Sequence, residues 1–81
     1  MKIREAQTFS DNVVDILTQE RIRQNISRYQ IAKECGLTEA ALCYIEHHDR
    51  RPTIYTLKMI ADALNIRLSD IIIQAEKNDS K

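Results

Sequence analysis

Apolar residues recur along this chain at the spacing of an α-helix, and the first such segment lies near the N-terminus. It carries four apolar positions, Val13, Val14, Leu17 and Ile22. Ser10 precedes them and can cap the free amides of a first helical turn, while Phe9 can pack on Val14. Asn25 tolerates the left-handed conformation that often follows a helix. We therefore predict a helix over residues 11–24.

The second and third segments flank Gly36, the one glycine of the chain. Ser27 begins a capping-box pattern, so the second helix is expected to start there and to stop at Gly36. Glycine takes a positive φ angle without steric cost, which lets the chain turn sharply before Thr38 caps a third helix over about 39–47. Two short helices joined by such a turn form a helix-turn-helix. The expected core positions are Ile31, Ala32, Cys35, Leu37, Leu42 and Ile45.

Two further helical segments follow in the C-terminal half. Pro52 and Thr53 are a start signal for a helix that ends at Asn65. Its apolar face holds Ile54, Leu57, Ile60, Ala61 and Leu64. Ser69 and Asp70 can begin a fifth helix, which carries three consecutive apolar residues, Ile71, Ile72 and Ile73. They are too many for one side of a helix, so at least one should be exposed in a monomer.

Composition supports a single all-α domain. The 81 residues are 43% hydrophobic, with one glycine and one proline, so helix formers are plentiful and turns between strands are few. We expect residues 1–9 to form an N-terminal arm, residues 10–74 the folded domain and residues 75–81 a flexible polar tail. No segment has the length of a membrane span or the apolar core of a signal peptide, which favours a cytoplasmic protein. Cys35 and Cys43 do not form a Cys-x-x-Cys pair, so reduced thiols are expected.

Charge is segregated along the chain although it sums to zero. Residues 1–20 hold two basic and four acidic side chains, whereas residues 21–36 hold four basic and one acidic. Arg50 and Arg51 add a second basic spot. A zero net charge argues against a polycation that coats nucleic acid, but a local positive patch can still contact phosphates. For each basic residue the alternative is a solvated helix surface.

These landmarks resemble those of helix-turn-helix domains of the lambda-repressor, Cro and Xre type, a five-helix DNA-binding family. The resemblance covers about residues 10–73 and rests on Leu17, Arg21, Ser27, Ile31-Ala32, Gly36-Leu37-Thr38, Leu42, Ile45-Glu46, Pro52, Ala61 and Leu64-Asn65-Ile66. It implies an all-α, lambda-repressor-like bundle of five helices. It also implies a largely buried ion pair between Arg21 and Glu46 that ties the first helix to the third. None of these landmarks reads DNA, so they bear on the fold more than on function.

The resemblance also implies which residues face DNA, with the third helix in the major groove and the start of the second on the phosphate backbone. The base-facing set is Glu39, Ala40, Cys43 and Tyr44. The phosphate set is Arg23, Ser27, Arg28, Tyr29, Thr38, Arg50 and Arg51. No base-facing residue can make a bidentate contact to guanine or adenine, although Glu39 can accept from a cytosine amine. His48 stands where this family usually has glycine, so that loop is expected to be remodelled.

Together these features predict a sequence-specific transcriptional regulator that binds double-stranded DNA as a homodimer. The candidates for its dimer interface are Ile71, Ile72 and Ile73. The alternative is a protein-interaction module on the same scaffold, antitoxin-like or bridging, with weak or no DNA binding. In that case an apolar surface around Ala40, Ala41 and Tyr44 would contact a partner protein.

Other chemistry is not indicated by the sequence. An enzyme is not expected, because the chain shows no nucleophile-base set, carboxylate pair or glycine-rich phosphate loop. No metal is expected at His47, His48 and Asp49, since adjacent histidines point apart and no further ligand completes a tetrahedral site. A redox switch at Cys43 is chemically conceivable, yet nothing obvious activates its thiol. No cofactor is predicted.

Overall fold

The computed structural model describes residues 2–79 and has five α-helices and no strand in that range. The helices are α1 (Ile3–Arg23), α2 (Arg28–Cys35), α3 (Glu39–Glu46), α4 (Ile54–Ala63) and α5 (Leu68–Asp79). This architecture confirms the predicted all-α fold and the order of its elements. No helix within the described range is long and apolar enough to cross a membrane.

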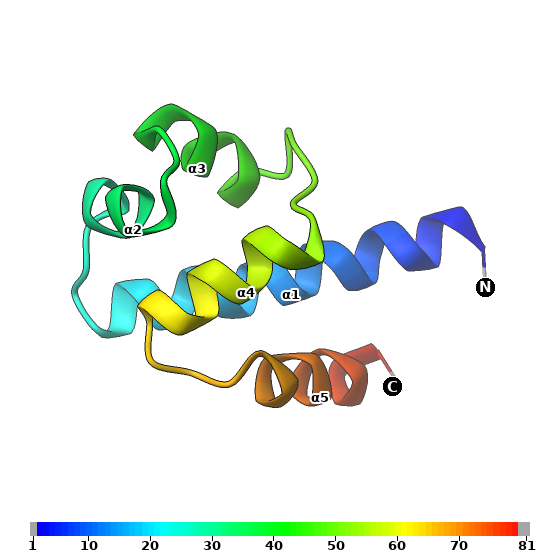
Figure 1. The fold of residues 1–81 in the computed structure, drawn as a ribbon. Helices are drawn as coiled ribbons and strands as arrows, with labels where there is room; N and C mark the ends of the chain where they lie inside the picture. The colour runs from blue at the N-terminus through cyan, green and yellow to red at the C-terminus, as the bar shows by residue number, and fades with distance from the viewer. Residues whose placement is uncertain (1, 80–81) are drawn as a thin grey trace.

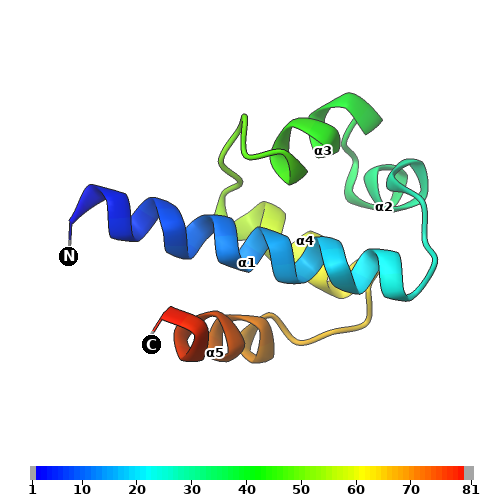
Figure 2. The ribbon, with the colours of Figure 1, turned by 180° about the vertical axis from the view of Figure 1, so that it is seen from behind.

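The long helix α1 is the element along which the others are arranged (Figure 1). α5 lies along one side of α1, and α2 and α3 lie together on the opposite side (Figure 1). α4 runs next to α1 between these two layers, and the first turns of α1 project past the other helices (Figure 2). The helix-turn-helix therefore forms an outer layer of the molecule, and its outer side is not covered by another helix (Figure 1).

The core forms where the five helices meet. It is a cluster of buried apolar side chains, Val13, Leu17, Ile31, Ala32, Leu42, Ile60, Ala61, Leu64, Ile71 and Ala75. Ala32 of α2 and Ala61 of α4 are almost fully buried, and their small side chains let these two contacting helices approach closely. Every buried side-chain nitrogen or oxygen in the described range has a hydrogen-bond partner. Burial of this cluster orients α2 and α3 relative to the rest of the bundle.

Side-chain caps set the starts of the short helices, as the sequence predicted. The Ser27 hydroxyl oxygen accepts a hydrogen bond from the Gln30 amide at 3.1 Å, which begins α2. The Thr38 hydroxyl oxygen accepts one from the Ala41 amide at 3.0 Å, which begins α3, and Thr53 caps α4 in the same way. Each cap satisfies an amide that has no partner within its own helix.

Residues in the left-handed conformation end several helices. Gly36 has a φ angle of 69° after α2 and Asn25 has 59° after α1, as predicted. Asn65 has 59° after α4, where the sequence predicted only the end of the helix. His48 has a φ angle of 66° after α3. The position therefore keeps a backbone conformation that glycine would supply, whereas the sequence predicted a remodelled loop.

The predicted start of the first helix is wrong. α1 begins at Ile3, so Ser10 lies inside the helix and does not cap it. Residues 3–9 include good helix formers, and the Glu5 carboxylate accepts a hydrogen bond from the Lys2 amide at 3.2 Å. This local stabilisation starts the helix two turns earlier, and most of the expected N-terminal arm is helical.

The predicted burial of Ile54 and the predicted end of the fifth helix are also wrong. Ile54 is exposed rather than on the inner face of α4, because it is the first residue of that helix and lies beyond the core. α5 continues to Asp79 through the polar tail that was expected from residue 75. Ala75 is fully buried one turn after Ile71, so the core face of α5 extends further than the isoleucines indicated. Ser80 and Lys81 lie outside the described residues.

The three consecutive isoleucines of α5 have different environments. Ile71 is buried in the core, and Ile72 is partly buried against it. Ile73 is half exposed, which confirms that at least one of the three is left on the surface of the single chain. Ile71 cannot contact a second copy in this conformation, so its place among the interface candidates is corrected.

Candidate nucleic-acid interface

The outer side of α3 presents most of the predicted base-facing residues. Leu42 and Ile45 point into the core, which turns Glu39, Ala40 and Tyr44 outward, where all three are exposed. The fourth predicted member, Cys43, is half-buried. The first three therefore lie on a surface that a nucleic acid can reach, and Cys43 lies at its margin.

The turn at Gly36 fixes how α3 projects from α2. The Leu37 amide donates to the Ala32 carbonyl at 2.8 Å, which closes the turn and brings Leu37 against the core. A Cβ atom added at Gly36 would meet nothing within 4 Å, so the requirement for glycine comes from its positive φ angle and not from lack of space.

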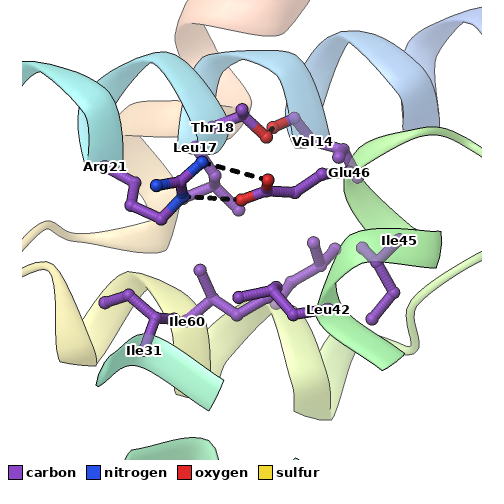
Figure 3. A pocket seen from close by; sticks show the side chains of 10 residues that line it. Val14, Leu17, Thr18, Arg21, Ile31, Leu42, Ile45, Glu46 and Ile60 are labelled. Carbon is purple, nitrogen blue, oxygen red and sulfur yellow. Dashed lines mark hydrogen bonds and ion pairs between the residues drawn. The ribbon is translucent and has the colours of Figure 1, made fainter. Parts of the chain in front are cut away.

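A buried ion pair joins the C-terminal end of α3 to α1 (Figure 3). The Arg21 guanidinium donates to both Glu46 carboxylate oxygens, at 2.8 and 3.1 Å, and its third nitrogen donates to the Ile26 carbonyl at 2.8 Å. Only 12% of the Arg21 side chain and 6% of the Glu46 side chain are exposed. The ion pair implied by the family resemblance is therefore confirmed.

A second arginine binds the same carboxylate. The Arg28 Nε atom donates to Glu46 Oε1 at 2.7 Å, and 37% of the Arg28 side chain is exposed. Burial acts to raise the pKa of Glu46, but the hydrogen bonds from Arg21 and Arg28 outweigh it, and the pKa lies below its usual value. Arg28, predicted to face phosphate, is thus partly committed to an internal contact that the sequence did not indicate.

Other cations near this surface differ in how free they are. Arg23 is paired with Glu20 one turn earlier on α1, and their hydrogen bond holds the pKa of Glu20 below its usual value. Lys33 and Arg51 are exposed and have no carboxylate within ion-pair distance in the part of the chain that the structure describes. The predicted phosphate set therefore contains both paired and available positive charges.

Neutral donors lie where α2 meets the start of α3. A shallow groove there is lined by Tyr29, Ala32, Lys33, Leu37, Thr38 and Glu39. Tyr29 is 61% exposed and can offer its hydroxyl group. The Ser27 and Thr38 oxygens accept from helix amides, which leaves their O–H groups to donate. The groove brings the predicted phosphate residues Tyr29 and Thr38 next to the base-facing Glu39.

The loop after α3 folds back over the helix. The Asp49 and Arg50 amides donate to the Tyr44 carbonyl at 2.9 and 3.3 Å. The Arg50 guanidinium lies over the Tyr44 ring, 5.6 Å from its centroid, within the range of a cation–π contact. The structure thus places Arg50, one of the expected phosphate residues, beside the base-facing Tyr44.

His48 ties the same loop to α1. Its Nε2 atom lies 2.9 Å from an Asp15 carboxylate oxygen, and its Nδ1 atom lies 3.3 Å from one of Asp11. The left-handed backbone at His48 directs the ring toward α1. Sequence reasoning missed this contact, because it joins residues more than thirty positions apart with no periodic pattern between them.

The neighbouring His47 turns the other way. Its Nδ1 atom lies 2.8 Å from the Cys43 carbonyl oxygen and 3.4 Å from the Cys43 sulfur. The two histidines therefore diverge, as expected. Across the described side chains of residues 2–78, no group of three or more histidine, cysteine or acidic residues is placed to hold a metal ion.

The small cavity beside the buried ion pair is mostly apolar (Figure 3). Leu17, Ile31, Leu42 and Ile60 are among the side chains that line it. It has about 10 Å³ of free space, which is enough for about one water molecule at most. A small-molecule effector does not fit there.

Comparison with known protein families identifies the family of this chain. A family model described as helix-turn-helix matches residues 17–71, from the last turns of α1 to the start of α5. Searches of curated proteins and of solved structures find no match. The matched range contains α2, the Gly36 turn, α3 and the ion pair between Arg21 and Glu46.

Proposed function

Because the chain belongs to the helix-turn-helix family of the lambda-repressor and Xre type, we propose that it is a sequence-specific transcriptional regulator that binds duplex DNA as a homodimer. A member of this family is a DNA-binding regulator in the general case, and the site favours the same role here. The observation that carries the proposal is the uncovered outer side of α3, where Glu39, Ala40 and Tyr44 are exposed.

In this proposal α3 enters the major groove, which is wide enough for a helix. Glu39 accepts from a cytosine amine, and Ala40 packs on a thymine methyl group. The N-terminal end of α2 meets the phosphate backbone through its free amides and through the Ser27 and Tyr29 hydroxyls. Lys33 and Arg51 supply positive charge to the same backbone.

A dimer binds DNA more tightly than a single domain does. Once one subunit is bound, the other is held close to its half-site. Two recognition helices then reach successive major grooves about 34 Å apart. Of the isoleucines in α5, Ile73 is the one most available to a second copy. Sedimentation of the protein at high micromolar concentration tests this part, since a strict monomer at that concentration contradicts the dimer.

The central experiment is selection of bound sequences from random duplexes at moderate salt. The expected result is a consensus with dyad symmetry, whose half-sites are about one helical turn apart. Recovery of unrelated sequences with no enrichment contradicts sequence-specific binding. The proposal places the protein in the cytoplasm, with no cofactor.

A second candidate function is the binding of a partner protein. The observation that favours it is that the surface formed by α2 and α3 exposes aromatic side chains but few unpaired charges. Tyr29 and Tyr44 are 61% and 49% exposed, while Arg23 and Arg28 are paired with carboxylates. Exposed tyrosines suit a protein partner as well as DNA. Salt separates the two functions, because contacts to phosphate weaken steeply as salt rises and an apolar protein contact does not.

A further inference from the structure

The base-facing side of α3 lacks a side chain that can recognise guanine from within the helix. Glu39 only accepts hydrogen bonds, Ala40 has no polar atom, and the single hydroxyl of Tyr44 cannot bind two atoms of a base edge at once. The most common specific contact to guanine uses two donors of an arginine or lysine on its O6 and N7 atoms. A complete reading surface therefore needs a donor from another element.

Arg50 is brought to this position by the loop that follows α3. Its backbone amide donates to the Tyr44 carbonyl at 3.3 Å, and its guanidinium lies 5.6 Å from the centroid of the Tyr44 ring. Tyr44 is exposed on the outer side of α3, so the guanidinium that contacts its ring lies next to the base-facing residues. The backbone bond and the ring contact hold the same arginine at two points.

The Arg50 guanidinium is also free to bind a ligand. Arg21 and Arg28 donate to Glu46, and Arg23 is paired with Glu20. Among the described side chains of residues 2–78, no carboxylate lies within ion-pair distance of Arg50. An aromatic ring contacts the flat face of a guanidinium and leaves the N–H groups on its edge available. The ring contact also lowers the conformational freedom that the side chain loses when it binds.

We propose that Arg50, held against Tyr44, reads a guanine in the major groove and is the main specificity-determining side chain of the site. This inference rests on the proposed DNA-binding function and names the base that the site recognises. The planar guanidinium donates two N–H groups to guanine O6 and N7, and Tyr44 acts as a positioning residue for it.

Arg51 offers a matched control. It is the next residue in the same loop, it is exposed, and it has no aromatic contact or carboxylate partner in the described part of the chain. Removal of an arginine that contacts phosphate lowers the affinity uniformly across sequences. It also reduces the salt dependence of binding by about one released counterion. An arginine that reads a base changes the preference at one position instead.

The experiment begins with the consensus selected by the wild-type protein. Binding is then measured on that duplex and on duplexes in which each guanine of a half-site is replaced in turn. We expect Arg50→Ala to reduce the preference for one guanine by about tenfold or more, and Arg50→Lys to reduce it by less, because lysine keeps donors for O6 and N7 but not the planar fork. Arg51→Ala should weaken binding to all duplexes alike.

Variants of Tyr44 test the positioning role. Tyr44→Phe keeps the ring and should keep the preference for guanine, whereas Tyr44→Ala should lose most of it. The melting temperatures of these variants show whether the fold is intact, and both tyrosine variants are compared at the same salt concentration. A loss of guanine preference in Tyr44→Ala that Tyr44→Phe restores supports the positioning role.

Several outcomes overturn the inference. A consensus without guanine in its half-sites, an unchanged guanine preference in Arg50→Ala, or a uniform loss like that of Arg51→Ala each exclude Arg50 as the guanine reader. All three leave the proposed DNA-binding function in place, because the wild-type protein still selects duplexes. Absence of any selected consensus for the wild type overturns both the function and the inference.

Discussion

The C-terminal end of α3 is joined to α1 at two places that differ in burial. At the first, Glu46 accepts hydrogen bonds from Arg21 and Arg28, and 6% of its side chain is exposed. At the second, His48 lies between Asp11 and Asp15, and its side chain is 33% exposed. Both are contacts between charged or ionisable groups. The first joins α3 itself to α1, and the second joins the loop after α3 to α1.

The difference in burial predicts unequal contributions to stability. If one partner of a buried ion pair is removed, the other keeps an uncompensated charge. The protein interior cannot solvate that charge as water does. An exposed pair exchanges its contacts for water at little cost, so it contributes about 0–1 kcal/mol. We therefore expect the contact at Glu46 to hold α3 in place and the contact at His48 to adjust the loop after it.

Replacement of Glu46 by alanine should have the largest effect. It leaves Arg21 without its buried partner, so we expect the free energy of unfolding to fall by about 3–5 kcal/mol. Thermal and urea denaturation followed by circular dichroism measure this loss. Glu39→Ala is the control, because Glu39 is an exposed acid on the same helix and should change stability by less than about 0.5 kcal/mol. Similar losses in the two variants contradict a special role for burial.

Acid should weaken the contact at Glu46 in a defined direction. The pKa of Glu46 is lowered in the folded state from its usual value of 4.5, so the stability it contributes is present above that value. It is lost as the pH falls through the folded pKa. The gap in melting temperature between wild type and Glu46→Gln should therefore be widest near neutral pH and shrink below about pH 4.5. A gap that does not change down to strongly acidic pH would contradict this linkage.

Local signals explain why much of the helix-turn-helix could be predicted. Ser27 and Thr38 each cap a helix through an amide three residues away, and Gly36 takes the positive φ angle that a tight turn requires. Such features depend on neighbours in the chain, so the sequence contains most of what determines them. The start of α1 was missed because two local signals compete there. The helix-forming residues before Ser10 prevail over its capping hydroxyl.

Contacts between distant residues explain what could not be predicted at the site. The pair of Arg21 and Glu46 was expected only through the family resemblance, and the bond from Arg28 to Glu46 was not expected at all. The ring contact of Arg50 with Tyr44 depends on a loop that reverses after α3. Hydrophobic periodicity says which side of a helix is buried, but it does not specify which polar side chains meet.

Substitution of His48 should have a smaller effect than substitution of Glu46, and alanine and glycine should differ. His48→Ala removes the contacts with α1 and keeps a side chain at a φ angle of 66°, so we expect a loss of about 1 kcal/mol. His48→Gly removes the same contacts but relieves the left-handed strain, so stability should stay within about 0.5 kcal/mol of wild type. Urea denaturation of both variants measures the difference. Equal losses would mean that the backbone at residue 48 carries no strain.

The smallest expected effect is that of Asp15, and salt makes it informative. Asp15→Asn removes the carboxylate 2.9 Å from His48, and because both groups are partly exposed we expect a loss of about 0.5 kcal/mol at low ionic strength. The two groups form an ion pair only when the His48 ring is protonated, and such an exposed pair is screened as the Debye length falls from about 10 Å at 0.1 M salt to about 3 Å at 1 M. In that state the loss should disappear at high salt. The loss in Glu46→Ala should persist there, because a buried pair is screened much less. A loss in Asp15→Asn that also persists at 1 M salt would mean that the His48 contact is not a solvent-exposed ion pair.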